Sequence, residues 1–270
     1  MRSLHAFGID LADALLGHGC LGCGSRAPRG RIVCDGCDAA IPRTGVVLCL
    51  RCMQEGGAHR TDGDPGGGLS SGSGAGSGCP RHGSERLLLA GPPFEPPLDR
   101  VVHAFKYSGA RGAHSWIAGF LPEPPGRGTV IWREYLLVPV PLHPSRRTWR
   151  GFDQAKLLAE AAGAQWGIPV VDVLLRTRDH SPQARLRAEA RRENVRDAFL
   201  LAGRGSRLLR SRPVLLVDDV ATTGSTLIEA AAAVQAGGPS WTLSLSACHG
   251  GLPPGPETPS SASVATTGRV

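Results

Sequence analysis

The chain has 270 residues, of which 41% are hydrophobic, and a formal net charge of +7. This length suits one sizeable folded domain and something smaller. No run approaches the roughly 18 apolar residues of a membrane-spanning helix, and Asp10 and Asp13 interrupt the segment where a signal peptide needs an unbroken apolar stretch. We therefore expect a cytoplasmic protein without membrane insertion. Its positive charge comes almost wholly from arginine, which suits phosphate-bearing partners, small or polymeric.

The cysteines mark out the N-terminal part of the chain. Seven of the eight precede residue 80, and they repeat one spacing, with two residues between neighbouring ligands. In a protein that is not exported a disulfide framework is not expected, whereas this spacing brings two ligand atoms within reach of one tetrahedral metal ion. Sequential pairing predicts two structural zinc sites, made by Cys20, Cys23, Cys34 and Cys37, and by Cys49, Cys52, Cys79 and His82.

Two cysteine questions remain open from the spacing alone. A long Gly/Ser-rich loop separates Cys52 from Cys79, and His59 in that loop competes with His82 as the fourth ligand of the second site. Cys248 stands alone after an apolar run, and we expect it to be a buried core residue.

The rest of the chain alternates between helical and strand-like patterns. Apolar residues at helical spacing predict helices at 98–109, 152–166 and 225–238, and apolar runs predict strands at 135–142, 169–175, 212–219 and 240–247. This alternation predicts a parallel sheet with ligands bound beyond the carboxyl ends of its strands. The tail after Gly250 has almost nothing to bury and is predicted to be disordered.

The stretch VLLVDDVATTGSTL, residues 214 to 227, ends one of these strands with two adjacent aspartates. The turn that follows lies at a helix N-terminus, where free backbone N–H groups and the helix dipole favour an anion. It lacks the lysine of a Walker loop and the spacing of a dinucleotide-binding loop. The pattern suits a sugar phosphate, because Asp218 and Asp219 can accept hydrogen bonds from vicinal hydroxyls while the turn binds the phosphate.

This stretch closely resembles the phosphoribosyl-diphosphate (PRPP) signature of type I phosphoribosyltransferases. With the cysteine pairs, HAFKYSG at 103–109, VPVPLHPSRRTWRGFDQAKLLA at 138–159 and SPQARLRAEARRENVRDAF at 181–199, the chain looks like a member of the ComF family. The resemblance implies a type I phosphoribosyltransferase-like parallel sheet flanked by helices, with an N-terminal double zinc ribbon. It implies a ribbon unit at 15–85, a phosphoribosyltransferase-like domain at 95–249 and a disordered tail at 251–270. The family pattern usually differs at His82, Asp153 and His180.

The resemblance also implies roles for particular residues. It implies that the ribose hydroxyls are bound by Asp218 and Asp219, the catalytic candidates. It implies that the 5′-phosphate is bound by the turn, which consists of Ala221, Thr222, Thr223, Gly224, Ser225 and Thr226. The diphosphate falls near the end of the 135–142 strand, where guanidinium groups are suited to bidentate phosphate contacts. There we favour Arg150, then Arg146, and Lys106 matches a lysine of the family.

The implied function is binding of PRPP with Mg²⁺ and transfer of its phosphoribosyl group to a nucleophile that the sequence does not name. The charged insertion at 178–199 is expected to close over the substrate as a hood. A second hypothesis has comparable weight. The zinc ribbons would bind single-stranded DNA for DNA uptake in competent bacteria, and the phosphoribosyltransferase fold would serve as a scaffold or PRPP sensor. The ribbons contain little aromatic surface for stacking bases, which weakens that role for them.

Overall fold

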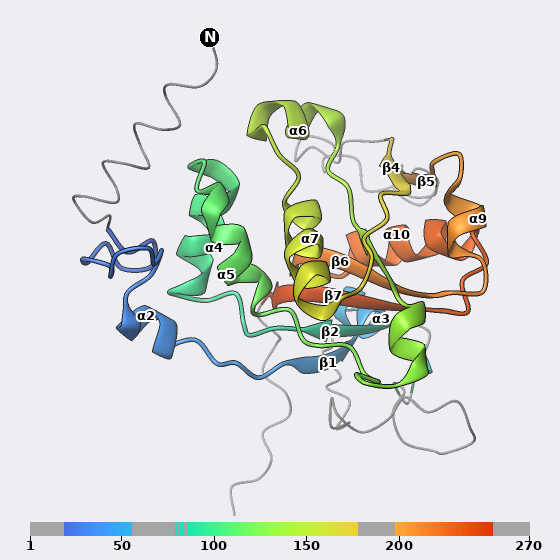
Figure 1. Ribbon diagram of the computed structural model, residues 1–270, viewed down its shortest axis with the longest axis horizontal. Helices are drawn as coiled ribbons and strands as arrows, with labels where there is room; N and C mark the ends of the chain where they lie inside the picture. Colours follow the sequence, from blue (N-terminus) through green and yellow to red (C-terminus); the bar gives the residue numbers. More distant parts are fainter. Residues whose placement is uncertain (1–18, 56–78, 80, 84–85, 178–197, 251–270) are drawn as a thin grey trace, which may run out of the picture.

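The structure is a computed structural model of the chain, and it describes residues 19–55, 79, 81–83, 86–177 and 198–250 (Figure 1). The hood predicted at 178–199 lies outside these ranges except for its last two residues. The tail at 251–270 and His59 also lie outside them.

A mostly parallel sheet of five strands forms the centre of the molecule, in the order β1-β2-β7-β6-β3. Strands β2, β7, β6 and β3 run parallel, and β1 pairs antiparallel with β2 at one edge. The strands are β1 (Val46–Cys49), β2 (Leu87–Ala90), β3 (Leu136–Pro139), β6 (Pro213–Ala221) and β7 (Trp241–His249). A separate antiparallel pair consists of β4 (Leu174–Arg176) and β5 (Phe199–Leu201).

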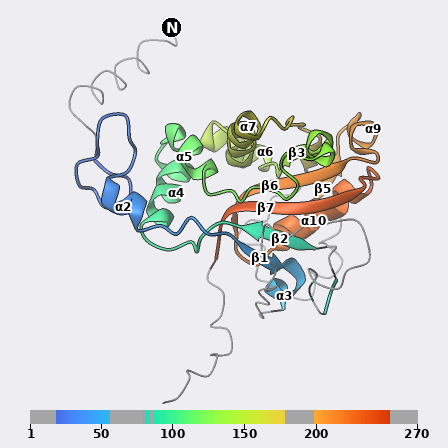
Figure 2. The ribbon, with the colours of Figure 1, turned by 60° about the horizontal axis from the view of Figure 1, so that its bottom comes forward.

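Helices cover both faces of the sheet, as Figures 1 and 2 show. On one face lie α4, α5 and α7; on the other lie α10 and α3. The described α-helices are α2 (Asp35–Ala39), α3 (Leu50–Gln54), α4 (Leu98–Tyr107), α5 (His114–Ala118), α6 (Pro144–Arg150), α7 (Gln154–Trp166), α9 (Gly205–Leu209) and α10 (Ser225–Gln235). Two 3-10 helices cover Arg111–Ala113 and Val130–Glu134.

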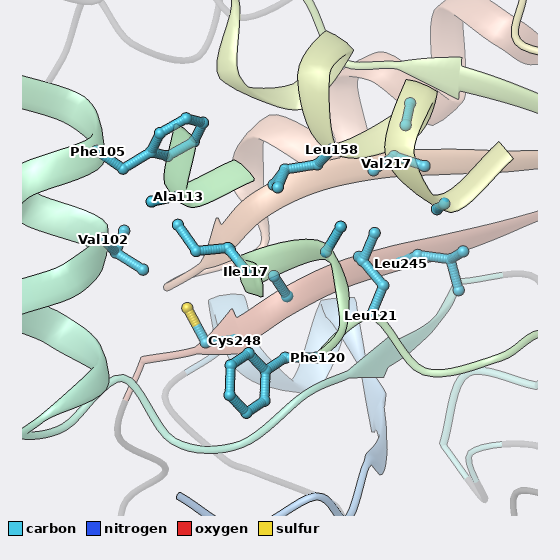
Figure 3. Close-up of a cluster of buried hydrophobic side chains, with 14 of the residues drawn as sticks. Val102, Phe105, Ala113, Ile117, Phe120, Leu121, Leu158, Val217, Leu245 and Cys248 are labelled. Carbon is cyan, nitrogen blue, oxygen red and sulfur yellow. The ribbon is translucent and has the colours of Figure 1, made fainter. Parts of the chain in front are cut away.

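The strands are apolar on both sides because both sides are covered. In β6, Leu215 and Val217 join the core beneath α4, α5 and α7, whereas Val214 and Leu216 join the core beneath α10. Figure 3 shows the first core, in which Phe105 and Leu158 approach the sheet from α4 and α7. Cys248 is fully buried there, as the sequence predicted.

The helices and strands largely follow the expected order, with one local difference. The run at 169–175 does not form a strand of the central sheet along its length. Only Val170 bridges to Leu137 at the sheet edge, and the pairing resumes as β4 with β5. Between these two points Asp172 pairs with Lys156, at 2.8 Å, which keeps a charged residue at the surface. Within the described ranges, no helix combines the length and the apolar character that crossing a membrane requires.

The N-terminal cysteine region is partly built into the sheet. Strand β1 ends at Cys49 and α3 begins at Leu50, so the second cysteine pair lies where an edge strand turns into a helix. Helix α3 then packs against α10. The boundary expected between residues 85 and 95 therefore separates two sequence regions that share one sheet.

Candidate functional site

The first cysteine cluster brings the four predicted ligands together. The Sγ atoms of Cys20, Cys23, Cys34 and Cys37 all lie within 4.8 Å of one another. Backbone N–H groups of Gly22 and Cys34 donate to Cys20 Sγ, at 3.3 and 3.2 Å. Hydrogen bonds from Ser25 lower the pKa of Cys23 to about 6. Donors aimed at sulfur stabilise thiolates, which are the form that binds a metal ion.

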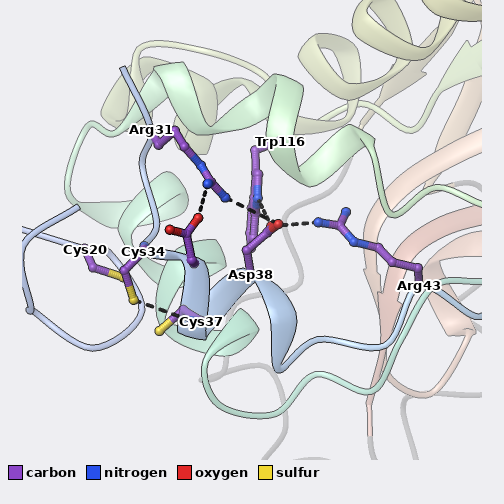
Figure 4. Close-up of polar contacts among 8 residues, drawn as sticks. Cys20, Arg31, Cys34, Cys37, Asp38, Arg43 and Trp116 are labelled. Atoms are coloured by element: carbon purple, nitrogen blue, oxygen red, sulfur yellow. Dashed lines mark hydrogen bonds and ion pairs between the residues drawn. The ribbon is translucent and has the colours of Figure 1, made fainter. Parts of the chain in front are cut away.

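Asp38 of α2 attaches this cluster to the α/β core (Figure 4). Its carboxylate accepts a hydrogen bond from the Trp116 indole of α5, at 2.8 Å, and pairs with Arg43 at 2.7 Å and with Arg31 at 3.4 Å. In addition, Arg100 of α4 donates to the Gly22 carbonyl, at 3.0 Å. The segment that forms the first cysteine cluster therefore contacts α5 and the N-terminal half of α4.

The second cluster consists of Cys49, Cys52, Cys79 and His82, again with all ligand atoms within 4.8 Å. His82 Nδ1 lies 3.5 Å from the sulfurs of both Cys49 and Cys52. Its other ring nitrogen, Nε2, lies 3.4 Å from a carboxylate oxygen of Glu55. A carboxylate on the far nitrogen is the usual partner of a zinc-binding histidine, because it fixes the ring and its tautomer. His82 therefore fits the position of fourth ligand.

Both clusters fit zinc rather than a looser assembly of thiols. Tetrahedral zinc with Zn–S bonds of about 2.3 Å requires sulfurs about 3.8 Å apart. The Cys23–Cys34 and Cys52–Cys79 sulfurs are each 3.6 Å apart. Three thiolates with one imidazole, and four thiolates, are both common structural zinc sets.

The acidic pair lies where β6 ends, as expected for residues 218 and 219. Asp219 is 8% exposed, and its Oδ2 atom lies 2.8 Å from Lys106 Nζ of α4. Its backbone N–H donates to Asp218 Oδ1, at 2.8 Å. Burial lowers the pKa of Lys106, but the Asp219 carboxylate more than offsets this and the pKa is raised. Lys106 is therefore a permanent positive charge beside the two carboxylates.

Burial, and then the neighbouring Asp219, raise the pKa of Asp218 to about 7. The folded protein then binds a proton between about pH 4 and 7 that the unfolded chain releases, so the free energy of unfolding falls as the pH rises through this window. Asp218→Asn keeps the Oδ1 acceptor and removes the charge. We expect the variant to be more stable than wild type at pH 8.5, by at least about 1.4 kcal/mol, the equivalent of one pKa unit.

Thermal unfolding of both proteins between pH 6 and 8.5 measures this difference. It should grow with pH and level off above about pH 7.5. An equal difference at every pH would contradict a raised pKa of Asp218.

The turn after the acidic pair contains one residue, Gly224, in the left-handed conformation that glycine adopts readily. Gly224 has a φ of 72° and begins α10 as its N-cap residue. Thr222 and Thr223 are exposed, and the Thr223 and Ser225 hydroxyl oxygens lie 2.9 Å apart. The turn thus presents hydroxyl groups and a helix N-terminus to solvent beside Asp218, an arrangement suited to an anion.

The second cysteine cluster supports this turn through α3. A Cβ atom on Gly224 would lie 2.8 Å from Leu50 Cδ2 and 3.3 Å from the Leu50 carbonyl oxygen. One turn further along α3, the Gln54 amide donates to the Ser225 hydroxyl, at 3.4 Å. Leu50 and Gln54 flank Cys52 in α3. Sequence reasoning missed both residues, since neither belongs to a motif.

The arginines predicted for the diphosphate lie in α6, after the loop that follows β3. Helix α6 has no buried residue. The Arg150 guanidinium lies 5.0 Å from the Tyr107 ring centroid, and its Nε is buried without a hydrogen-bond partner among the described residues. Tyr107 directly follows Lys106, so the C-terminal end of α6 approaches the C-terminal end of α4. Assignment of Arg146, Arg150 and Lys106 to a diphosphate stays a prediction.

Two buried polar residues follow α6 in the chain. Asp153 caps α7 and accepts hydrogen bonds from the backbone N–H groups of Leu142, at 2.9 Å, and Lys156, at 3.3 Å. Burial raises the pKa of Asp153 despite these two donors. Gln154 is 2% exposed, and neither end of its amide has a hydrogen-bond partner among the described residues. Burying a polar group without a hydrogen-bond partner costs folding free energy. The only indication of this residue in the sequence is an amide next to the apolar residues of α7.

No family model matches the chain. It is 38% identical to Competence protein F of Haemophilus influenzae over 133 residues, which are 49% of this chain and 52% of that protein. It is 32% identical to DNA utilization protein YhgH of Escherichia coli over 145 residues, 51% of this chain and 61% of that protein. It is 26% identical to Competence protein ComFC of Streptococcus pneumoniae over 195 residues, 72% of this chain and 77% of that protein. The first two matches thus span between half and two thirds of those relatives.

The fold and the two clusters define an α/β protein with a mostly parallel sheet and an N-terminal region suited to two structural zinc ions. The cysteine pairs of these clusters and the aspartates at the end of β6 are among the residues on which the family resemblance rests. The similarity to these competence and DNA utilization proteins supports the resemblance to the ComF family.

Proposed function

We propose that this protein binds PRPP at the carboxyl end of β6, in a phosphoribosyltransferase-like fold. The observation that carries the proposal is the pair of adjacent aspartates, of which Asp219 is buried against Lys106, followed at once by the Gly224 turn. A ribose diol donates hydrogen bonds to carboxylates, and a 5′-phosphate accepts them from backbone N–H groups at a helix N-terminus. Both groups of one sugar phosphate can be bound by residues 218 to 226.

The carboxylates and the lysine have complementary roles in this proposal. Asp219 is held by Lys106, which limits the repulsion between two adjacent carboxylates and fixes the orientation of one of them. Asp218, with its raised pKa, exchanges a hydrogen bond from water for one from a ribose hydroxyl when the sugar binds. We therefore expect Asp219 to orient the sugar and Asp218 to respond to its binding.

The diphosphate would lie towards α6, with Arg150 and Arg146 as guanidinium ligands and Lys106 nearby. Mg²⁺, which the resemblance implies, would neutralise part of the diphosphate charge. In transfer, the bond between the anomeric carbon and the diphosphate oxygen breaks as a nucleophile bonds to that carbon from the opposite side. The chain's own part is to hold the sugar and the leaving group in position.

The N-terminal clusters complete the proposal. We propose two zinc ions, one in each cluster, as structural ions of a unit at 15–85 that is joined to the phosphoribosyltransferase-like domain at 95–249. The relatives' names, which refer to competence and to DNA utilization, further support a role in DNA uptake or DNA utilization. In that role we propose that the protein contacts single-stranded DNA. PRPP binding would then act as catalysis or as a signal in that role.

Titration of the purified protein with PRPP and Mg²⁺ in a calorimeter tests the proposal. Wild type should bind, and the Asp218→Asn, Asp219→Asn double variant should lose at least about 1.5 kcal/mol, or more than tenfold in Kd, because hydrogen bonds to charged groups are lost. A matched control removes two exposed carboxylates elsewhere, by Glu134→Gln and Glu160→Gln, and should bind as wild type does.

Circular dichroism and zinc content of each variant separate loss of the site from loss of the fold. Absence of PRPP binding by folded wild type at millimolar concentration would end the proposal. Equal affinity of the aspartate double variant would remove residues 218 and 219 from it.

A further inference from the structure

Two aromatic side chains lie exposed beside each other at the ends of α4 and α6. Tyr107 is 54% exposed and Trp149 is 68% exposed, and their ring centroids are 5.9 Å apart. Every other Phe, Tyr and Trp in the described ranges is at least partly buried. Because large exposed rings are costly in water, their occurrence as one pair suggests a binding surface rather than scattered exposure.

The aromatic surface extends along α4. The His103 ring is exposed one turn before Tyr107, with centroids 5.5 Å apart, and it stacks on Phe94 at 6.0 Å. The rings of Trp149, Tyr107 and His103 therefore form a row with spacings of 5.9 and 5.5 Å. Successive planar groups of a ligand could each meet one of these rings.

Positive charge borders the same row. Helix α6 contributes Arg146, Arg147 and Arg150 and no acidic residue. Arg147 is exposed, and the Arg150 guanidinium lies over the Tyr107 ring. A row of rings beside a run of arginines matches a polymer of planar bases joined by phosphates.

We propose that this Tyr107–Trp149 surface, made of His103, Tyr107, Arg147, Trp149 and Arg150, binds an unpaired nucleic-acid strand. Its bases stack on the rings and its phosphates pair with the α6 arginines. A duplex hides the faces of its bases, so the surface selects single strands. The inference rests on the proposed role in DNA handling and locates the contact at α4 and α6 instead of at the cysteine clusters, whose first unit, 19–41, contains no aromatic residue.

Fluorescence anisotropy of a short labelled oligothymidylate, at two salt concentrations, tests this surface. Trp149→Ala should weaken binding at least about fivefold, since one stacked base contributes at least about 1 kcal/mol, and should leave the salt dependence unchanged. Trp149→Phe, which keeps a ring, should bind within about twofold of wild type. Arg147→Gln should weaken binding and lower the slope of log K against log salt by about 0.7.

The chain offers matched controls. Arg207→Gln removes an equal charge from an exposed position of α9 and should leave affinity within about twofold. PRPP binding should survive Trp149→Ala, because this side chain does not belong to the proposed sugar-phosphate site. Tyr107→Ala is tested for oligothymidylate binding alone, since its ring packs on Arg150.

The outcomes separate two failures. If folded wild type binds no oligothymidylate, the proposed DNA role and this inference both fail. If wild type binds but the alanine variants bind equally well, only the Tyr107–Trp149 surface is excluded. Equal affinity for a duplex of the same length, or saturation of the surface by thymidine monophosphate at the same concentration as by the oligomer, would also overturn it.

Discussion

Cys52→Ala should release one zinc ion and weaken PRPP binding at least tenfold, whereas Cys34→Ala should release the other zinc ion and leave PRPP affinity within about twofold. The difference follows from what each cluster supports. Cys52 lies in α3, whose Leu50 fills the space behind Gly224 and whose Gln54 donates to Ser225. A short helix of this kind has little stability without its metal site.

Among the residues that the structure describes, the first cluster has no such connection to the turn. It rests on α5 and the N-terminal half of α4, whereas Lys106 lies in the last turn of α4. Loss of its zinc should unfold that unit locally and spare the sheet.

Three measurements on each variant check this prediction: zinc content, PRPP affinity, and hydrogen exchange of the amides at 222–226. Cys52→Ala should increase exchange in the turn, and Cys34→Ala should not. If both variants lose PRPP affinity equally, the support through α3 is not specific. If Cys52→Ala loses zinc yet binds PRPP normally, α3 does not position the turn.

Gly224→Val should destabilise the protein by at least about 2 kcal/mol, the sum of the lower bounds of two costs. A branched residue at a φ of 72° is strained by about 1–3 kcal/mol. Its Cβ would also lie 2.8 Å from Leu50 Cδ2, and overpacking costs a further 1–3 kcal/mol, roughly. The structure thus shows that a Cβ atom at this position meets α3.

Gly238 provides the matched control for this variant. It has a φ of 66°, and a Cβ there would meet nothing within 4 Å. Gly238→Val therefore carries the backbone strain without the contact, and urea unfolding should place its cost at least about 1 kcal/mol below that of Gly224→Val. Equal costs for the two variants would contradict the packing of Gly224 on α3.

Sequence alone predicted those parts of the fold that are determined by consecutive or closely spaced residues. The β6–turn–α10 stretch carries its apolar run, acidic pair and glycine in fourteen consecutive residues, 214 to 227. The spacing of the cysteine pairs likewise predicted both ligand sets, which the structure brings together, His82 included.

Contacts between distant parts of the chain could not be predicted in the same way. Gln54 and Ser225 are 171 residues apart, and neither belongs to a periodic pattern. The contact between Tyr107 and Trp149 depends on how α4 and α6 pack, which no local spacing encodes. The run at 169–175 was misjudged along most of its length because apolar periodicity does not show where a strand leaves its neighbour.

The shared sheet limits how this protein could have been assembled in evolution. A gene fragment that begins after residue 85 would encode β2 without β1, leaving β2 as an edge with unpaired backbone groups that invite aggregation. It would also lack α3, the helix behind Gly224. The described residues of the first cysteine cluster add no strand to this sheet, whereas the second cluster could not be exchanged by recombination without rebuilding the sheet edge.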